Sequence, residues 1–166
     1  VTALDFDYEE FSDQEKSLNR EQGWLPGTSL GLIYESQTSL ILDGRLRRLS
    51  GTADYSSPTA DSNTDEEILD LSLTVGIPLP ATQQNRLHLT AGGGYRKWWR
   101  NIRSTQTAFG LDEIYHWKYL SIGLQGRRHY SPKTARSAQI ELRRTINPEM
   151  SVDFHQTFDD ANLSLK

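Results

Sequence analysis

The chain has 166 residues, no cysteine and a net charge of -4, which suits a single domain over 1–166 and excludes disulfides and cysteine-based zinc sites. A mild negative charge does not fit general nucleic-acid binding, which requires a basic excess. The mean hydropathy is -0.63, and no apolar run approaches the roughly 20 residues of a membrane-spanning helix, so a helical membrane protein is excluded. Val1–Asp5 does not join a basic segment to an apolar one, so we expect a signal peptide to be absent or already removed.

Apolar and polar residues alternate with a period of two along most of the chain, as in β-strands with two different faces. The alternation predicts eight strands, in chain order about Thr2–Phe11, Thr28–Glu35, Leu40–Arg47, Leu69–Leu79, Arg86–Trp99, Ile114–Gly126, Arg136–Ile146 and Ser151–Phe158. Longer expected connections (Ser12–Gly23, Asp54–Asp65, Arg100–Glu113) alternate with shorter ones (Ser36–Thr38, Pro78–Asn85, Arg127–Ala135), and the turn Asn147–Glu149 breaks the pattern.

The clearest strand pattern lies in Leu69–Leu79, where every second residue is Leu, Val or Ile and the residues between them are Asp, Ser, Thr and Gly. This run is about as long as a transmembrane β-strand, roughly 9–11 residues. The alternation is equally compatible with an apolar face toward lipid and with one toward a soluble core.

Aromatic and basic residues gather where the fifth and sixth expected strands meet. Trp and Tyr prefer the headgroup zone of a membrane, and Arg and Lys suit lipid phosphates. We therefore expect a rim that contacts lipid headgroups, formed by Tyr95, Lys97, Trp98, Trp99, Arg100, Arg103, Tyr115, Trp117, Lys118 and Tyr119.

Charges of both signs recur on the polar phase of the expected strands. An eight-stranded barrel is just wide enough for side chains to fill it, and buried charges must be paired. We therefore expect a charge network in a polar lumen, formed by Asp5, Asp7, Glu9, Asp43, Arg45, Arg47, Arg96, Glu141 and Arg143.

In its alternating strands, sorted loops and aromatic placement, the chain resembles the small bacterial outer-membrane β-barrel proteins. The resemblance implies a closed antiparallel up-and-down transmembrane β-barrel of eight strands in the bacterial outer membrane. We expect a monomer without cofactor or metal that contacts membrane lipid and lipopolysaccharide but no nucleic acid. The expected role is structural, adhesive or in envelope integrity.

Other functions stay open. His129 and Ser131 with Glu141 resemble the catalytic set of outer-membrane lipid A deacylases, in which a serine needs a histidine base and an orienting acid, so an enzyme is an alternative although a non-catalytic role is favoured. A soluble lipocalin-like binding barrel is a second alternative, and a small-solute channel is a third if the native barrel is larger. The acidic stretch Asp61–Glu67 lacks the glycine of a calcium loop, so a hydrated loop is expected there.

Overall fold

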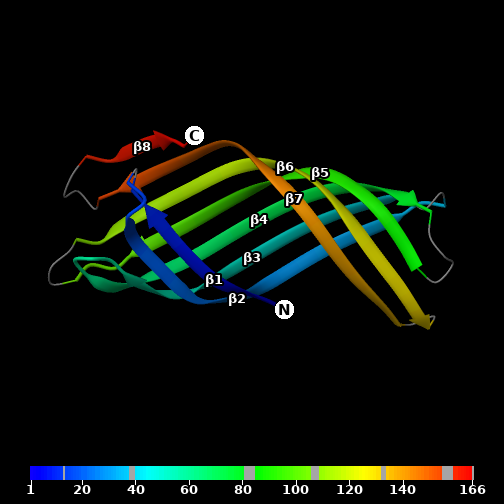
Figure 1. Ribbon diagram of the computed structural model, residues 1–166, viewed down its shortest axis with the longest axis horizontal. Helices are drawn as coiled ribbons and strands as arrows, with labels where there is room; N and C mark the ends of the chain where they lie inside the picture. The colour runs from blue at the N-terminus through cyan, green and yellow to red at the C-terminus, as the bar shows by residue number, and fades with distance from the viewer. Residues whose placement is uncertain are drawn as a thin grey trace.

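A computed structural model describes residues 1–12, 14–37, 40–80, 85–105, 109–131, 134–154 and 159–165 of the chain. These residues form one antiparallel sheet in which each strand pairs with the next one along the chain (Figure 1). The strands are β1 (Thr2–Phe11), β2 (Ser17–Glu35), β3 (Ile41–Ser56), β4 (Asp61–Leu79), β5 (Asn85–Ile102), β6 (Leu111–Ser131), β7 (Thr134–Asp153) and β8 (Ala161–Ser164). The prediction of eight antiparallel up-and-down strands is confirmed.

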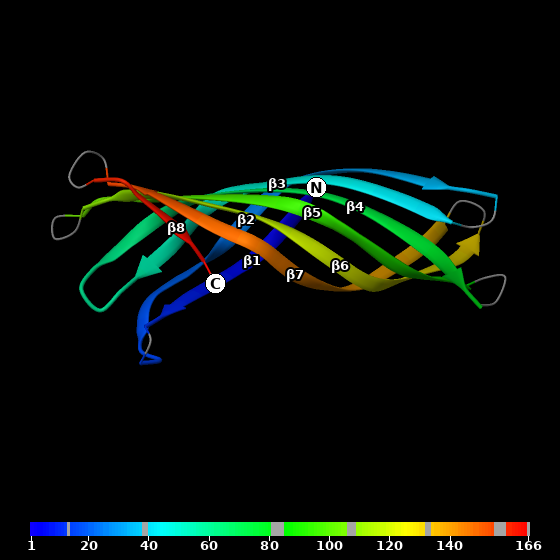
Figure 2. The ribbon, with the colours of Figure 1, turned by 90° about the horizontal axis from the view of Figure 1, so that it is seen from above.

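The sheet is curled into an open half-barrel (Figure 2). Within the described residues, β1 and β8 are the two edges of the sheet and do not pair with each other. The short β8 pairs only with Glu149–Val152 of β7. The structure therefore shows the strand order expected of a barrel but not its closure.

Most strands are longer than the sequence predicted, and the expected long loops are largely strand. Within the segments expected as loops, Ser17–Gly23 pairs with β1, and Asp54–Ser56 pairs with Asp61–Asn63. The connections between strands lie at two opposite ends of the sheet. We call the half of the sheet next to the connections 12–16, 57–60, 103–110 and 154–160 the loop half. The half next to the connections 36–40, 80–84 and 132–133 is the turn half. The polar residues that suggested loops, including the calcium-like Asp61–Glu67, lie in extended strands with alternating burial.

The turn expected at Asn147–Glu149 is a bulge within one continuous strand. The β6–β7 register shifts between His116 and Lys118, and Asn147 has a φ of 46°. Asparagine tolerates this left-handed conformation better than most residues, and the extra residue of a bulge is left out of the ladder. The expected eighth strand therefore begins inside β7, its residues 155–158 lie outside the described part of the chain, and the observed β8 starts at Ala161.

The two faces of the sheet differ in what they bury. Contacts between strands that are not neighbours, such as Phe6 of β1 against Trp98 of β5 and Arg143 of β7 on Asp70 of β4, identify the concave face. In the loop half this face carries an apolar core of Phe6, Leu25, Leu49, Ala53, Ile68, Trp98 and Tyr115.

In the turn half the polarity of the faces is reversed. There the concave face is polar, with Asp43, Asp70, His88 and Thr90 buried, and the convex face is apolar. Leu71 and Leu73 on the convex face are 54% and 56% exposed, whereas Asp70 is 4% exposed. The sequence-based expectation that the leucines of Leu69–Leu79 face outward and the polar residues face inward describes this half of the sheet.

No helix long and apolar enough to cross a membrane occurs among the described residues.

Candidate functional site

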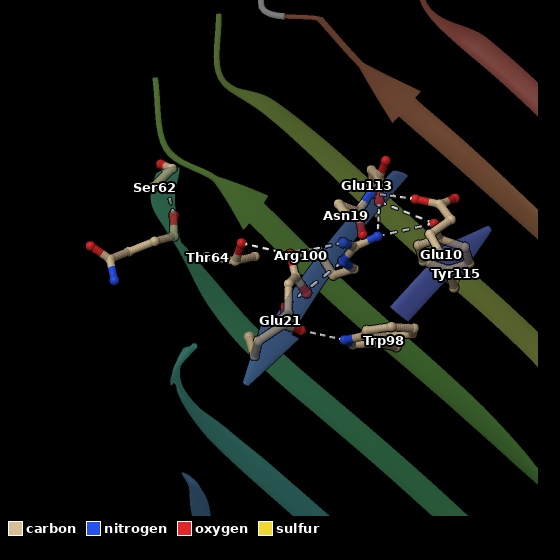
Figure 3. Close-up of polar contacts among 11 residues, drawn as sticks. Glu10, Asn19, Glu21, Ser62, Thr64, Trp98, Arg100, Glu113 and Tyr115 are labelled. Carbon is tan, nitrogen blue, oxygen red and sulfur yellow. Dashed lines mark hydrogen bonds and ion pairs between the residues drawn. The ribbon is translucent and has the colours of Figure 1, made fainter. Parts of the chain in front are cut away.

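The concave face of the loop half holds a buried ionic cluster of Glu21, Glu66, Arg100 and Glu113, here called the Arg100 cluster. Figure 3 shows Glu21, Arg100 and Glu113 of this cluster. Arg100 Nη2 donates a hydrogen bond to Glu21 Oε1 at 2.8 Å, and Arg100 Nη1 donates one to Glu113. Glu66 Oε1 lies 3.8 Å from Arg100 Nε. The side chains of Arg100, Glu21 and Glu66 are buried, so this cluster is an internal feature of the curled sheet.

Aromatic rings enclose the cluster. The guanidinium carbon of Arg100 lies 4.8 Å from the ring centroid of Tyr8 and 5.2 Å from that of Trp98, so cation–π attraction adds to the ion pairs. Trp98 Nε1 donates to Glu66, and Thr64 Oγ1 donates to Glu21 at 2.8 Å. These rings and hydroxyls keep water away from the charges and satisfy part of their hydrogen-bonding capacity.

Three carboxyl groups share one guanidinium in this cluster, so ionising all three would leave buried negative charge uncompensated, at a large cost in free energy. Burial, together with the adjacent Glu21 carboxylate, raises the pKa of Glu66 to about 8. Burial also raises the pKa of Glu113, although Arg100 opposes the effect. Glu21 Oε2 and Glu66 Oε1 have no hydrogen-bond partner among the described residues, and a proton held by Glu66 gives these neighbouring carboxyl groups a bond to share.

A second set of charges, the Asp70 cluster, lies where the loop half meets the turn half. Asp70 Oδ2 accepts from Arg96 Nε at 2.8 Å and from Arg143 Nη1 at 3.2 Å, and its Oδ1 accepts from Tyr119 Oη at 3.0 Å. Arg47 Nη2 lies 3.7 Å from the same carboxylate. The remaining members are Asp43 with Arg45 and Glu141 with Arg143.

A glycine makes room for the Tyr119 contact. A Cβ on Gly94 of β5 would lie 2.4 Å from the Cζ and Oη atoms of Tyr119. The absence of a side chain therefore allows the Tyr119 ring to cross β5 and reach Asp70 on β4.

The structure brings together six of the nine residues expected in a lumen charge network: Asp43, Arg45, Arg47, Arg96, Glu141 and Arg143. The other three, Asp5, Asp7 and Glu9, are exposed on the convex face, opposite the buried Phe6, and the structure does not bring them to these charges. The reason is that β1 pairs only with the loop half of β2, where apolar residues occupy the concave face. Asp7 instead pairs with the exposed Arg20 at 2.7 Å, a contact that lowers the pKa of Asp7.

The expected rim divides between the two faces. Trp98, Arg100, Tyr115, Trp117 and Tyr119 belong to the concave face, where all but the partly buried Trp117 are buried. These five side chains lie in the interior of the curled sheet and not on an outer rim. Five others are exposed or half-exposed away from that interior: Tyr95, Lys97, Trp99, Arg103 and Lys118.

The three candidate catalytic residues do not assemble. Ser131 ends β6 opposite Thr134, whereas Glu141 lies seven residues further along β7, about 23 Å away at roughly 3.3 Å per residue. Glu141 is paired with Arg143 at 3.0 Å. His129 lies in β6, but its side chain is outside the described part of the structure.

The Arg100 cluster was not predicted. Glu21, Glu66 and Glu113 lie in segments that were expected to be loops, so their strand phase was not considered. Their signal in the sequence is the pair Ile68–Leu69, where two consecutive apolar residues interrupt the alternation and exchange the faces.

Among the described residues, no group of three or more His, Asp or Glu side chains is arranged to hold a metal ion. Comparison of the chain with protein-family models, with curated proteins and with solved structures finds no match. The fold and the two charge clusters are therefore the findings from which a function is inferred.

Proposed function

We propose that the chain forms the strands of an integral outer-membrane β-barrel whose convex apolar face contacts lipid. The observation that carries the proposal is an exposed apolar band across the convex face of the turn half. It includes Leu30, Leu32, Leu42, Leu46, Leu71, Leu73, Val75, Ile77, Leu89, Leu120, Ile122, Leu124, Ile140 and Leu142, each at least 36% exposed. Soluble monomers rarely expose a contiguous apolar patch of this extent.

The band is continuous because the strand register aligns its members in rows. Leu30 pairs with Leu46, and Leu46 pairs with Leu71. Ile77 pairs with Leu89, which pairs with Leu124. Along β4, Leu69–Leu79 spans about 33 Å at roughly 3.3 Å per residue, which at a tilt of about 40° matches the roughly 25 Å apolar band of outer-membrane barrels.

Polar and aromatic side chains border the band on the loop side, where lipid headgroups would lie. Tyr95 pairs with Leu71 and with Lys118 at this border, and Lys97 Nζ lies 4.4 Å from the ring centroid of Trp99. Lysine, tyrosine and tryptophan suit the interface between acyl chains and headgroups. We therefore assign the proposed lipopolysaccharide contact to these convex residues.

Barrel closure belongs to the proposal as well. In lipid, an open sheet edge leaves backbone N–H and C=O groups without partners, at a cost of several kcal/mol each. Closure would pair the free edges of β1 and of β7–β8. The expected role is structural or adhesive, since the interior carries paired charges. A lipocalin-like function is not favoured, because the concave face of the turn half is charged.

Two neighbouring positions on β4 test the proposal, and the chain has no cysteine that would interfere. Leu73→Cys places a spin label on the convex face, and Ser72→Cys places one on the concave face. In reconstituted liposomes, the Leu73 label should collide more often with lipid-soluble oxygen than with a water-soluble nickel chelate, and the Ser72 label should show the reverse. Equal water accessibility at both positions, or a protein that stays monomeric in buffer without detergent, would contradict lipid contact.

A further inference from the structure

The Asp70 cluster borders a cavity on the concave face that the structural role does not explain. The cavity has a volume of about 240 Å³. Its charged lining consists of Arg45, Arg47 and Arg143 with Asp70 and Glu141. The neutral lining includes the hydroxyl groups of Ser29 and Ser72, which can donate hydrogen bonds, and Thr74, whose hydroxyl donates to the Asp43 carbonyl oxygen at 3.4 Å. Cations thus outnumber carboxylates around a small polar space.

The carboxylates of the cluster are occupied by other donors. Asp70 accepts from Arg96, Arg143 and Tyr119. Asp43 accepts from both Nε and Nη2 of Arg45, and Glu141 accepts from both Nε and Nη2 of Arg143. These contacts leave little capacity for another guanidinium.

Among the four arginines of the cluster, Arg47 has no carboxylate oxygen within ordinary hydrogen-bond distance in the described structure. It is flanked in its row by Ser29 on β2 and by Asp70 on β4. Its Nη2 lies 3.7 Å from Asp70 Oδ2, beyond ordinary hydrogen-bond distance. The side chain is 34% exposed and lines the cavity, so its donors are available to a ligand.

We propose that this cavity binds a small oxyanion, through a carboxylate or phosphate group held by Arg47. The planar guanidinium presents paired N–H donors that match two oxygens of such a group. The adjacent hydroxyl groups can complete the contacts. The named members of the cluster, four arginines and three carboxylates, carry a net charge of +1 that a bound anion neutralises.

The test measures binding to the detergent-solubilised chain in a non-ionic detergent at pH 7 and constant ionic strength, with chloride as the supporting anion. Broadening of the ³¹P signal of inorganic phosphate reports the phosphate arm, and broadening of ¹³C-labelled acetate reports the carboxylate arm. The wild-type chain should show saturable broadening in at least one arm. Arg47→Gln should weaken that binding at least tenfold, as expected for loss of a charge-assisted hydrogen bond.

Arg48→Gln is the matched control, because it removes the same charge one residue away on the convex face, where Arg48 pairs with Glu67 at 2.9 Å. It should change the affinity by less than twofold. If Arg47→Gln does not fold, Arg47→Lys keeps the charge, removes the paired donors and should weaken binding at least threefold. No saturable binding by the wild type, or equal losses at positions 47 and 48, would refute the site. Because this measurement needs no bilayer, its result is independent of the lipid-contact test.

Discussion

Glu66→Gln tests whether the Arg100 cluster holds a proton at neutral pH. Glu66 is 2% exposed, and its side chain shares Arg100 with two other carboxylates. A glutamine has nearly the same shape as a protonated glutamate. Its oxygen can accept from Trp98 Nε1, and its amide can donate toward Glu21. The variant therefore retains the contacts of the protonated form and removes the possibility of ionisation.

The sign and size of the effect follow from the pKa. Folding raises the pKa of Glu66 from 4.5 to about 8, so between these values the folded chain keeps a proton that the unfolded chain releases. The contribution of Glu66 is fully present below pH 4.5 and is lost as the pH rises toward 8. Within this window the contribution of Glu66 to the free energy of unfolding falls by about 1.4 kcal/mol per pH unit, or by about 3 kcal/mol between pH 5.5 and 7.5.

Urea unfolding in detergent, followed by tryptophan fluorescence at a series of pH values, measures this dependence. The free energy of unfolding of Glu66→Gln relative to wild type should increase steadily from pH 5.5 to 7.5. Glu67→Gln, which removes a carboxylate from the adjacent convex position, should keep the wild-type slope. If Glu66→Gln and wild type have parallel pH profiles, Glu66 is ionised throughout and the assignment of the proton is wrong.

Two further stability predictions use matched pairs of variants in the same assay. Arg100→Met removes the only cation among the residues of the Arg100 cluster and should lower the free energy of unfolding by about 3–5 kcal/mol. Arg103→Met breaks an exposed ion pair and should lower it by less than about 1 kcal/mol. Similar losses for the two variants would show that Arg100 is not buried among carboxylates. Leu49→Ala in the concave core, where Leu49 is 1% exposed, should cost about 2–5 kcal/mol in detergent. Leu46→Ala on the convex face of the same strand should cost clearly less, and the reverse order would contradict the assignment of the faces.

The alternation of apolar and polar residues located β1 to β7 in chain order, although the expected eighth strand begins inside β7 and the observed β8 was not predicted. The alternation was insufficient for the ends of the strands. Ser, Asp, Asn and Thr dominate segments such as Asp54–Asp65, and these residues favour turns in isolation. Here long antiparallel ladders override that local preference, and the side chains pair across strands, as Thr52 does with Asp65 at 2.9 Å.

The Asp70 cluster was predictable because its members lie in strands whose phase was assigned correctly. The Arg100 cluster was not, since its carboxylates come from three strands whose ends were expected to be loops. Trp98 and Tyr115 were assigned to an outer rim for a different reason: the aromatic content of their segments was recognised, but not which face of the strand each ring occupies. Composition alone cannot say which side of a strand a tryptophan occupies.

The change of face explains both the successes and the errors of the prediction. In β3, Leu46 is convex and Leu49 is concave, and in β4 the exchange falls between Leu69 and Ile68. In the loop half the concave face carries the apolar core together with the buried, paired charges of the Arg100 cluster, and the convex face is mostly polar. In the turn half the same strands turn leucines outward and charges inward, the arrangement of a barrel in lipid. A barrel sheet that passes from water into a bilayer needs an apolar convex face only within the bilayer, so a change of the convex face from polar to apolar at one level across neighbouring strands fits the proposed lipid contact. The boundary at Ile68–Leu69 therefore supports lipid contact more strongly than the alternation of Leu69–Leu79 does, because a soluble sheet can show the alternation without the exchange.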